Sequence, residues 1–160
     1  MDAQRPETAA EAWRELSRRY VQDVSRYFRE RTVGEVARFL FQGGGRYGNC
    51  PLHDQFLAQA QEQVDLFVSG NPAASEAGTL LEAILLGPRP GADHPAGLCL
   101  IAAEGLALPL IPLAETGVLT DVADRYNRQF SRRTPALPIQ DRLRRAMREG
   151  LARRGAKTTQ

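Results

Sequence analysis

The sequence contains very few of several residue types that would indicate a particular class of protein. Its 160 residues include two cysteines, two histidines, one tryptophan and one lysine. Two cysteines exclude a disulfide-stabilised scaffold, which needs several bridges. Two histidines leave little scope for histidine-based catalysis, and neither a nucleophile elbow nor a metalloprotease helix motif is present. We therefore do not expect an enzyme.

The sequence also lacks an apolar stretch long enough to cross a membrane. Its most apolar segment, residues 98–113, is interrupted by Glu104, Pro109 and Pro112, whereas a membrane-spanning helix needs about 20 apolar residues with few charges. Residues 1–16 are polar and charged, where a secretory signal would have an apolar core. We therefore expect a cytoplasmic protein with no membrane span.

Apolar side chains recur at spacings of three and four along most of the chain, which is the pattern of amphipathic helices. With 42 % hydrophobic and 25 % charged residues, the composition is that of an ordinary globular protein. The pattern predicts helices through residues 13–31, 33–42, 51–69, 72–86, 98–113, 116–132 and 139–154. In the helix over 51–69 the apolar stripe is Leu52, Phe56, Ala60, Val64, Phe67 and Val68. We predict an all-α fold, a compact bundle of six or seven short helices.

The segment 98–113 leaves one alternative open. As a helix it would be apolar on nearly every side and would end or bend near Pro109, because proline interrupts helical hydrogen bonding. As two strands it would form a small hairpin turning at Glu104 and Gly105, which would make the fold α+β. We prefer the helix, and we expect Glu104 at a turn with its carboxylate in water.

Charge is unevenly distributed along the chain. The net charge is +2 over residues 1–46, −9 over 47–124 and +9 over 125–160. The basic end can fold back on the acidic middle, pair with the acidic middle of another copy, or remain free for an external polyanion. We divide the chain into two parts. Residues 1–134 form a helical domain, and residues 135–160 form a basic amphipathic C-terminal helix whose end frays from Ala156.

Arginines surround an apolar seam on the C-terminal helix. The simplest interpretation is a solvated helix that packs on the domain through this seam. The arginines can also contact a partner protein or the phosphates of a nucleic acid, although no known nucleic-acid-binding motif accompanies them. The candidate contact residues are Arg128, Arg132, Arg133, Arg142, Arg144, Arg145, Arg148, Arg153 and Arg154.

The four cysteines and histidines fall in two pairs, Cys50 with His53 and His94 with Cys99. Two cysteines and two histidines are a ligand set of tetrahedral zinc sites. Against such a site, the spacings are not those of a known zinc finger, a domain of this size needs no metal to fold, and Cys99 can equally be a small buried apolar residue. We expect no cofactor unless zinc binds here.

Taken together, these features predict a non-catalytic binding or adaptor protein. It would act through contacts with another protein or with a second copy of itself. One alternative is a regulatory protein that binds nucleic acid through its arginine-rich end. A second alternative is a metal-binding protein built on the two cysteines and two histidines.

Overall fold

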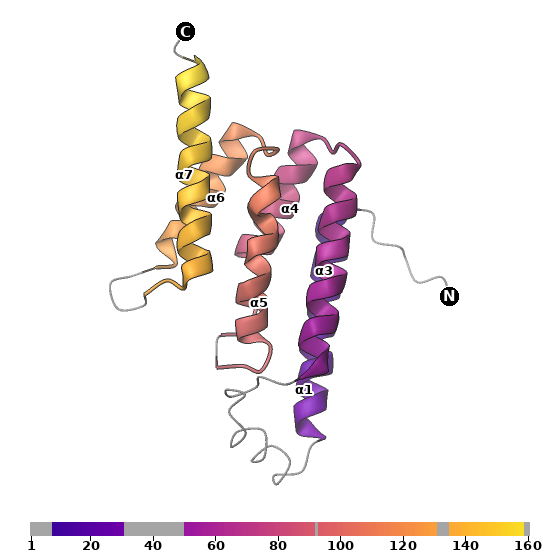
Figure 1. Ribbon diagram of the computed structural model, residues 1–160. Coiled ribbons are helices and arrows are strands. Elements are labelled where there is room, and N and C mark those ends of the chain that lie inside the picture. The colour runs from indigo at the N-terminus through magenta and orange to yellow at the C-terminus, as the bar shows by residue number, and fades with distance from the viewer. Residues whose placement is uncertain (1–7, 31–49, 92, 131–134, 159–160) are drawn as a thin grey trace.

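The computed structural model describes residues 8–30, 50–91, 93–130 and 135–158, with side chains described as far as Gly155. Within these ranges the chain forms six α-helices and one 3-10 helix and no strand (Figure 1). The elements are α1 (Ala9–Arg29), α3 (Pro51–Ser69), α4 (Ala74–Leu86), α5 (Gly97–Ala103), the 3-10 helix η1 (Glu104–Leu110), α6 (Thr116–Arg128) and α7 (Pro138–Thr158). The predicted all-α bundle is confirmed. The helix predicted over 33–42 lies outside the described residues.

Helices α1 and α3 pack side by side along most of their length (Figure 1). Thr8 caps α1 by accepting a hydrogen bond from the Glu11 amide at 3.1 Å, which satisfies one of the amides left open at a helix start. Tyr20 of α1 stacks on Phe56 of α3 with ring centroids 4.2 Å apart, and Trp13 lies 6.2 Å from the same ring. This aromatic contact joins the two amphipathic faces that the sequence pattern predicts.

Helix α4 lies in the centre of the bundle, where it contacts α1, η1 and α6. Leu81 and Leu85 have no exposed surface. Gly78 lies against Val118 of α6, and a Cβ atom at this position would be 2.9 Å from the Val118 Cγ1 atom. The missing side chain at Gly78 therefore allows α6 to approach α4 closely.

The segment 98–113 is helical as far as Leu110, as we preferred, and continues as a turn over residues 111–113. The hairpin alternative is wrong. Helix α5 continues directly into η1, whose tighter 3-10 geometry contains Pro109 near its end. Proline lacks the amide that an α-helix interior needs, and short 3-10 turns are common where an α-helix ends. Ala103, Ala107 and Leu110 are buried, so this apolar segment is part of the core.

Helix α7 packs on α6 and η1 through the predicted seam, in which Leu143 and Met147 are fully buried. It continues to Thr158. Residues 156–158 are therefore helical, and the prediction that the chain frays from Ala156 is wrong for these three residues. The division of the chain at residue 134 stays a prediction, but α7 contributes side chains to the common core. None of the described helices combines the length and apolarity needed to cross a membrane.

Candidate functional site

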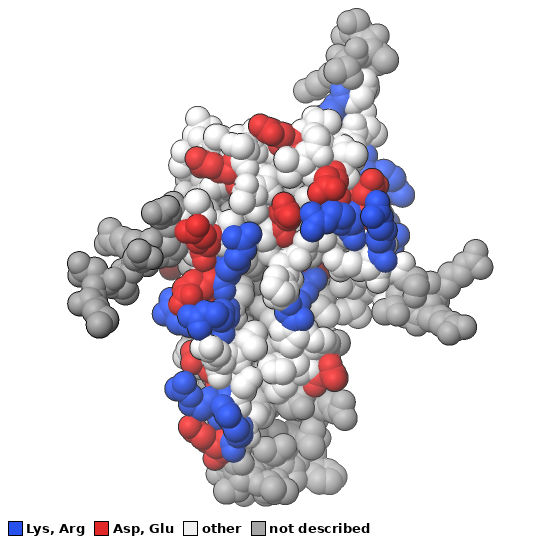
Figure 2. All heavy atoms as spheres, turned by 180° about the vertical axis from the view of Figure 1, so that it is seen from behind, with Lys and Arg blue, Asp and Glu red and all other residues white. Residues whose placement is uncertain are grey.

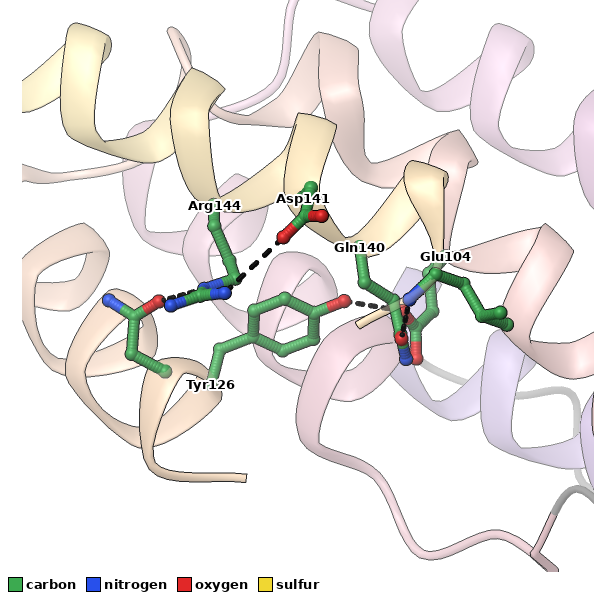
Figure 3. A network of polar contacts seen from close by, with 7 residues as sticks. Glu104, Tyr126, Gln140, Asp141 and Arg144 are labelled. Atoms are coloured by element: carbon green, nitrogen blue, oxygen red, sulfur yellow. Dashed lines mark hydrogen bonds and ion pairs between the residues drawn. The ribbon is translucent and has the colours of Figure 1, made fainter. Parts of the chain in front are cut away.

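A buried polar cluster lies where η1, α6 and α7 meet. Glu104 has no exposed surface, so the expectation that its carboxylate reaches water is wrong. It forms an ion pair with Arg89, whose side chain is 21 % exposed, and it accepts a hydrogen bond of 2.5 Å from the Tyr126 hydroxyl. Figure 3 shows Tyr126 pointing at Glu104, with Gln140 of α7 beside them. The side-chain oxygen of Gln140 accepts a hydrogen bond from the Leu137 amide at 2.9 Å.

Burial dominates the acid–base properties of this cluster. It raises the pKa of Glu104 because a charged carboxylate is disfavoured away from water, and Arg89, Tyr126 and Gln140 only partly oppose that effect. The pKa of Tyr126 is also raised, first by burial and then by its hydrogen bond to Glu104. Since Glu104 has no surface open to a substrate, the arrangement ties η1 to α6 and to the loop after α4, and it does not expose a reactive group.

A second set of polar contacts continues along the seam between α6 and α7. The Arg144 Nε atom donates to the Asn127 Oδ1 atom at 2.8 Å, and its Nη1 atom lies 3.3 Å from the Asp141 Oδ1 atom. Figure 3 shows Arg144 and Asp141 projecting from the same helix. The Arg144 guanidinium also lies 5.1 Å from the centre of the Phe130 ring. Arg144 therefore holds α7 against α6.

The remaining predicted contact arginines fall into four groups. Arg154 is fixed within the molecule, because it donates to the Ile111 carbonyl at 2.8 Å and to the Thr116 hydroxyl at 3.1 Å. Arg153 lies 3.9 Å from Glu149. Arg128, Arg142, Arg145 and Arg148 are exposed and form no ion pair with any described residue. Arg132 and Arg133 lie outside the described residues.

Three of the four predicted zinc ligands lie around Tyr20. The Tyr20 hydroxyl and the His53 Nδ1 atom share a hydrogen bond of 2.5 Å, and the Cys99 thiol lies 3.8 Å from the His53 carbonyl oxygen. Burial raises the pKa of Cys99, although its hydrogen bond with Tyr20 partly opposes this. Cys50 is buried and directly precedes α3.

The fourth predicted ligand, His94, uses both ring nitrogens in other contacts. Its Nδ1 atom accepts a hydrogen bond from the Ala96 amide at 3.0 Å, and its Nε2 atom lies 3.2 Å from the Ser25 hydroxyl. Across the described ranges, no group of three or more histidine, cysteine, aspartate or glutamate side chains is placed to hold a metal ion. The zinc site stays a prediction, and the geometry favours a hydrogen-bonded junction between α1, α3 and α5.

An apolar hollow opens near the beginning of α1 and the end of α3. We call it the Leu66 hollow; it has a volume of about 210 Å³ and is lined by Ala9, Ala12, Trp13, Gln63, Val64, Leu66 and Leu80. Leu66 is 68 % exposed, the highest exposure of any large apolar side chain in the described structure. This hollow was not predicted from the sequence. The signal was available, because Leu66 is an apolar residue that lies off the predicted stripe of its helix.

Acidic and basic side chains are interspersed over the face of the molecule shown in Figure 2. Most of the ion pairs on the described surface lie within one helix, and one joins two helices: Arg125 of α6 lies 3.1 Å from Glu82 of α4. The surface of α3 and α4 differs from this pattern, because residues 51–86 include five acidic residues and no lysine or arginine. The exposed surface of these two helices is therefore acidic as well as locally apolar.

Comparisons with known proteins add no functional information: no family model matches the chain, and neither a curated protein nor a solved structure is significantly similar to it.

Proposed function

We propose that this protein is a non-catalytic binding protein that acts through contacts with another protein. The observation that carries the proposal is the Leu66 hollow, an apolar cavity at the surface with an exposed leucine at its edge. Apolar cavities of this kind accept the side chains that anchor protein interfaces. Trp13, the only tryptophan in the chain, lines the cavity.

The energetic gain from covering this surface is substantial for a single side chain. Full burial of a leucine stabilises a complex by about 1.5–3 kcal/mol. Leu66 still exposes two thirds of its surface, so its burial by a partner contributes roughly 1–2 kcal/mol on the same scale. Contact with the half-buried Ala12 adds to that value. Filling the hollow therefore supplies part of the free energy of binding, and the contacts around it must supply the rest.

The buried carboxylate also supports a binding role. Glu104 has the environment that often gives a catalytic acid its raised pKa. However, all of its surface is covered by the protein, and its partners Arg89 and Tyr126 come from the loop after α4 and from α6. This arrangement supports a structural function for the cluster, so we place the functional site on the surface of the protein.

Affinity purification of the tagged full-length chain from its source cells tests the proposal. We expect a stoichiometric protein partner that is lost with Leu66→Gln. Leu98→Gln is the matched control, because Leu98 is 60 % exposed on α5, a helix that does not line the hollow. Native mass spectrometry gives the stoichiometry. A chain that purifies alone, or a partner retained by Leu66→Gln, would contradict the proposal.

A second candidate function is nucleic-acid binding through α7. Arg142, Arg145 and Arg148 support it, because their spacing of three places them on one side of the helix, exposed and without ion pairs to described residues. Arginines that neutralise phosphates produce binding that weakens steeply as salt increases. Arg144, by contrast, is engaged with Asn127 and is not part of this surface.

Fluorescence anisotropy with a labelled DNA or RNA oligonucleotide tests this second function. Replacing the three exposed α7 arginines by glutamine should abolish binding and flatten its dependence on salt. The control replaces Arg14, Arg26 and Arg29 of α1, which are also exposed, and removes the same charge. Equal losses in the two triple variants would indicate non-specific attraction and refute an α7 interface.

A further inference from the structure

We infer that the Leu66 hollow binds a basic amphipathic helix of a partner protein. One apolar side chain of that helix enters the hollow, and lysines or arginines on its flanks pair with Glu62, Asp65 and Glu76. This inference rests on the proposed function and specifies the chemistry of the partner.

The shape of the seam between α1 and α3 fits a helix. A second hollow of about 180 Å³ lies on the same seam, lined among others by Leu16, Asp23 and Gln59. On α1, residues 12, 16, 19 and 23 recur at helical spacing and line one side of the seam. From residue 9 to residue 23 the seam is about 21 Å long at 1.5 Å per residue. A partner helix of about four turns spans both hollows and presents anchors at the spacing of one helical face.

The charge of the surrounding surface selects a basic partner. Glu62 is four residues before Leu66 and therefore on the same side of α3. Asp65 is its neighbour in sequence, and Glu76 lines an adjoining hollow of about 280 Å³ that shares Ala9 with the Leu66 hollow. All three acids are exposed, and none forms an ion pair with a described residue.

Some acids elsewhere on the described surface are paired with arginines. Glu15 is paired with Arg18 and Arg19 on α1, and Glu82 is paired with Arg125 of α6. The pairing of Glu15 with Arg19 also neutralises the charge on the α1 side of the seam. Glu62, Asp65 and Glu76 have no such partner, so an incoming cation beside the apolar hollow meets no arginine that already neutralises them.

The chain's own basic helix does not provide the matching surface. Helix α7 has exposed arginines, but its apolar residues Leu143 and Met147 are fully buried against the domain. The described part of α7 in a second copy could therefore supply the charge, but its seam residues Leu143 and Met147 are not available as an apolar anchor. A separate protein with both features on one helix is the occupant that the surface favours.

A synthetic peptide tests this inference directly. The probe is a helix of about 18 residues made of leucine, alanine and lysine, with leucines on one face and lysines on the other and no aromatic residue. Because Trp13 is the only tryptophan and lines the hollow, its emission reports occupancy. We expect a shift in Trp13 emission and a dissociation constant on the order of 10 μM or below.

Two variants should weaken binding at least tenfold: Leu66→Gln and the triple variant Glu62→Gln/Asp65→Asn/Glu76→Gln. The matched control is the triple variant Asp93→Asn/Glu115→Gln/Asp124→Asn, which removes three exposed charges elsewhere and should bind like the unmodified protein. A peptide with glutamate in place of every lysine should not bind. Thermal unfolding followed by circular dichroism checks that each variant is folded, as expected for substitutions of exposed residues.

Several results would overturn the inference: no binding of the basic peptide, equal binding of the acidic peptide, or equal weakening in both triple variants. Sedimentation that shows a dimer dispersed by Leu66→Gln would identify a second copy as the occupant and also overturn it. If affinity purification still finds a partner that depends on Leu66 while the basic peptide fails, only the inferred partner chemistry is wrong. If no partner depends on Leu66, the proposed function itself fails.

Discussion

Replacing Tyr126 with phenylalanine removes one hydroxyl from the buried cluster and changes almost nothing else. Tyr126 has no exposed surface, and its hydroxyl donates to Glu104 at 2.5 Å. The ring remains in place, so no cavity forms. A hydrogen bond to a charged group contributes about 1.5–3 kcal/mol to stability, and we expect Tyr126→Phe to lower the free energy of unfolding by about that amount.

The size of this effect makes it measurable by ordinary unfolding experiments. A loss of 1 kcal/mol lowers the Tm of a domain of this size by about 2–4 °C, so Tyr126→Phe should lower it by about 3–12 °C. Urea unfolding at neutral pH, followed by circular dichroism, measures the free energy directly. The slope of the transition should not change, because the substitution leaves the buried area nearly the same.

A double-mutant cycle assigns the loss to this particular hydrogen bond. In a Glu104→Gln background the acceptor is neutral, so Tyr126→Phe should cost only about 0.5–1.5 kcal/mol. The difference between the two backgrounds is the coupling between Tyr126 and the charge on Glu104. If Tyr126→Phe costs less than about 0.5 kcal/mol, or costs the same in both backgrounds, the hydroxyl does not stabilise the charged carboxylate and our reasoning is refuted.

Three other predictions concern pH, close packing and the C-terminal helix. Burial raises the pKa of Glu104, so its stabilising contribution is present below the unfolded pKa of about 4.3 and is lost as pH rises through the folded pKa. In urea unfolding, the free energy of unfolding of Glu104→Gln should therefore increase relative to that of the unmodified protein as pH rises. The same pH dependence in both proteins would contradict this. Gly78→Ala should lower the Tm because its Cβ atom would crowd Val118, and the loss should be recovered by adding Val118→Ala. Gly117→Ala is its control, since nothing lies near that position, and it should leave the Tm unchanged or higher. Met147→Ala should cost about 2–5 kcal/mol in a single cooperative urea transition, whereas separate melting of α7 would show that it does not belong to the core.

Periodic apolar spacing was sufficient to predict most of the helices. The bounds of α3 match the prediction, because Pro51 and Gly70 mark the two ends of an amphipathic run. The long segment 98–113 was harder, since a continuously apolar run is compatible with either a buried helix or buried strands. Pro109 indicates where the helix is interrupted, but it does not indicate that the residues before it adopt 3-10 geometry in contact with α4 and α7.

The candidate sites depended much more on long-range contacts. Glu104 and Tyr126 are 22 residues apart, and nothing in their spacing indicates that they meet. Similarly, the sequence shows nine candidate contact arginines but does not distinguish Arg144, which is bound to Asn127, from Arg145, which faces solvent. The partners of a long charged side chain are set by which elements pack beside it.

Helical spacing, chain length and the lack of a long uncharged apolar stretch were enough to predict an all-α bundle, because these are properties of local segments. Packing alone revealed that Glu104 is sealed among Arg89, Tyr126 and Gln140. Packing also revealed that α7 is docked through Leu143 and Met147, and that Leu66 edges an open apolar hollow beside unpaired acids. The physical reason is that burial and pairing are properties of surfaces brought together from distant parts of the chain, and a side chain's type does not specify which surface it will meet.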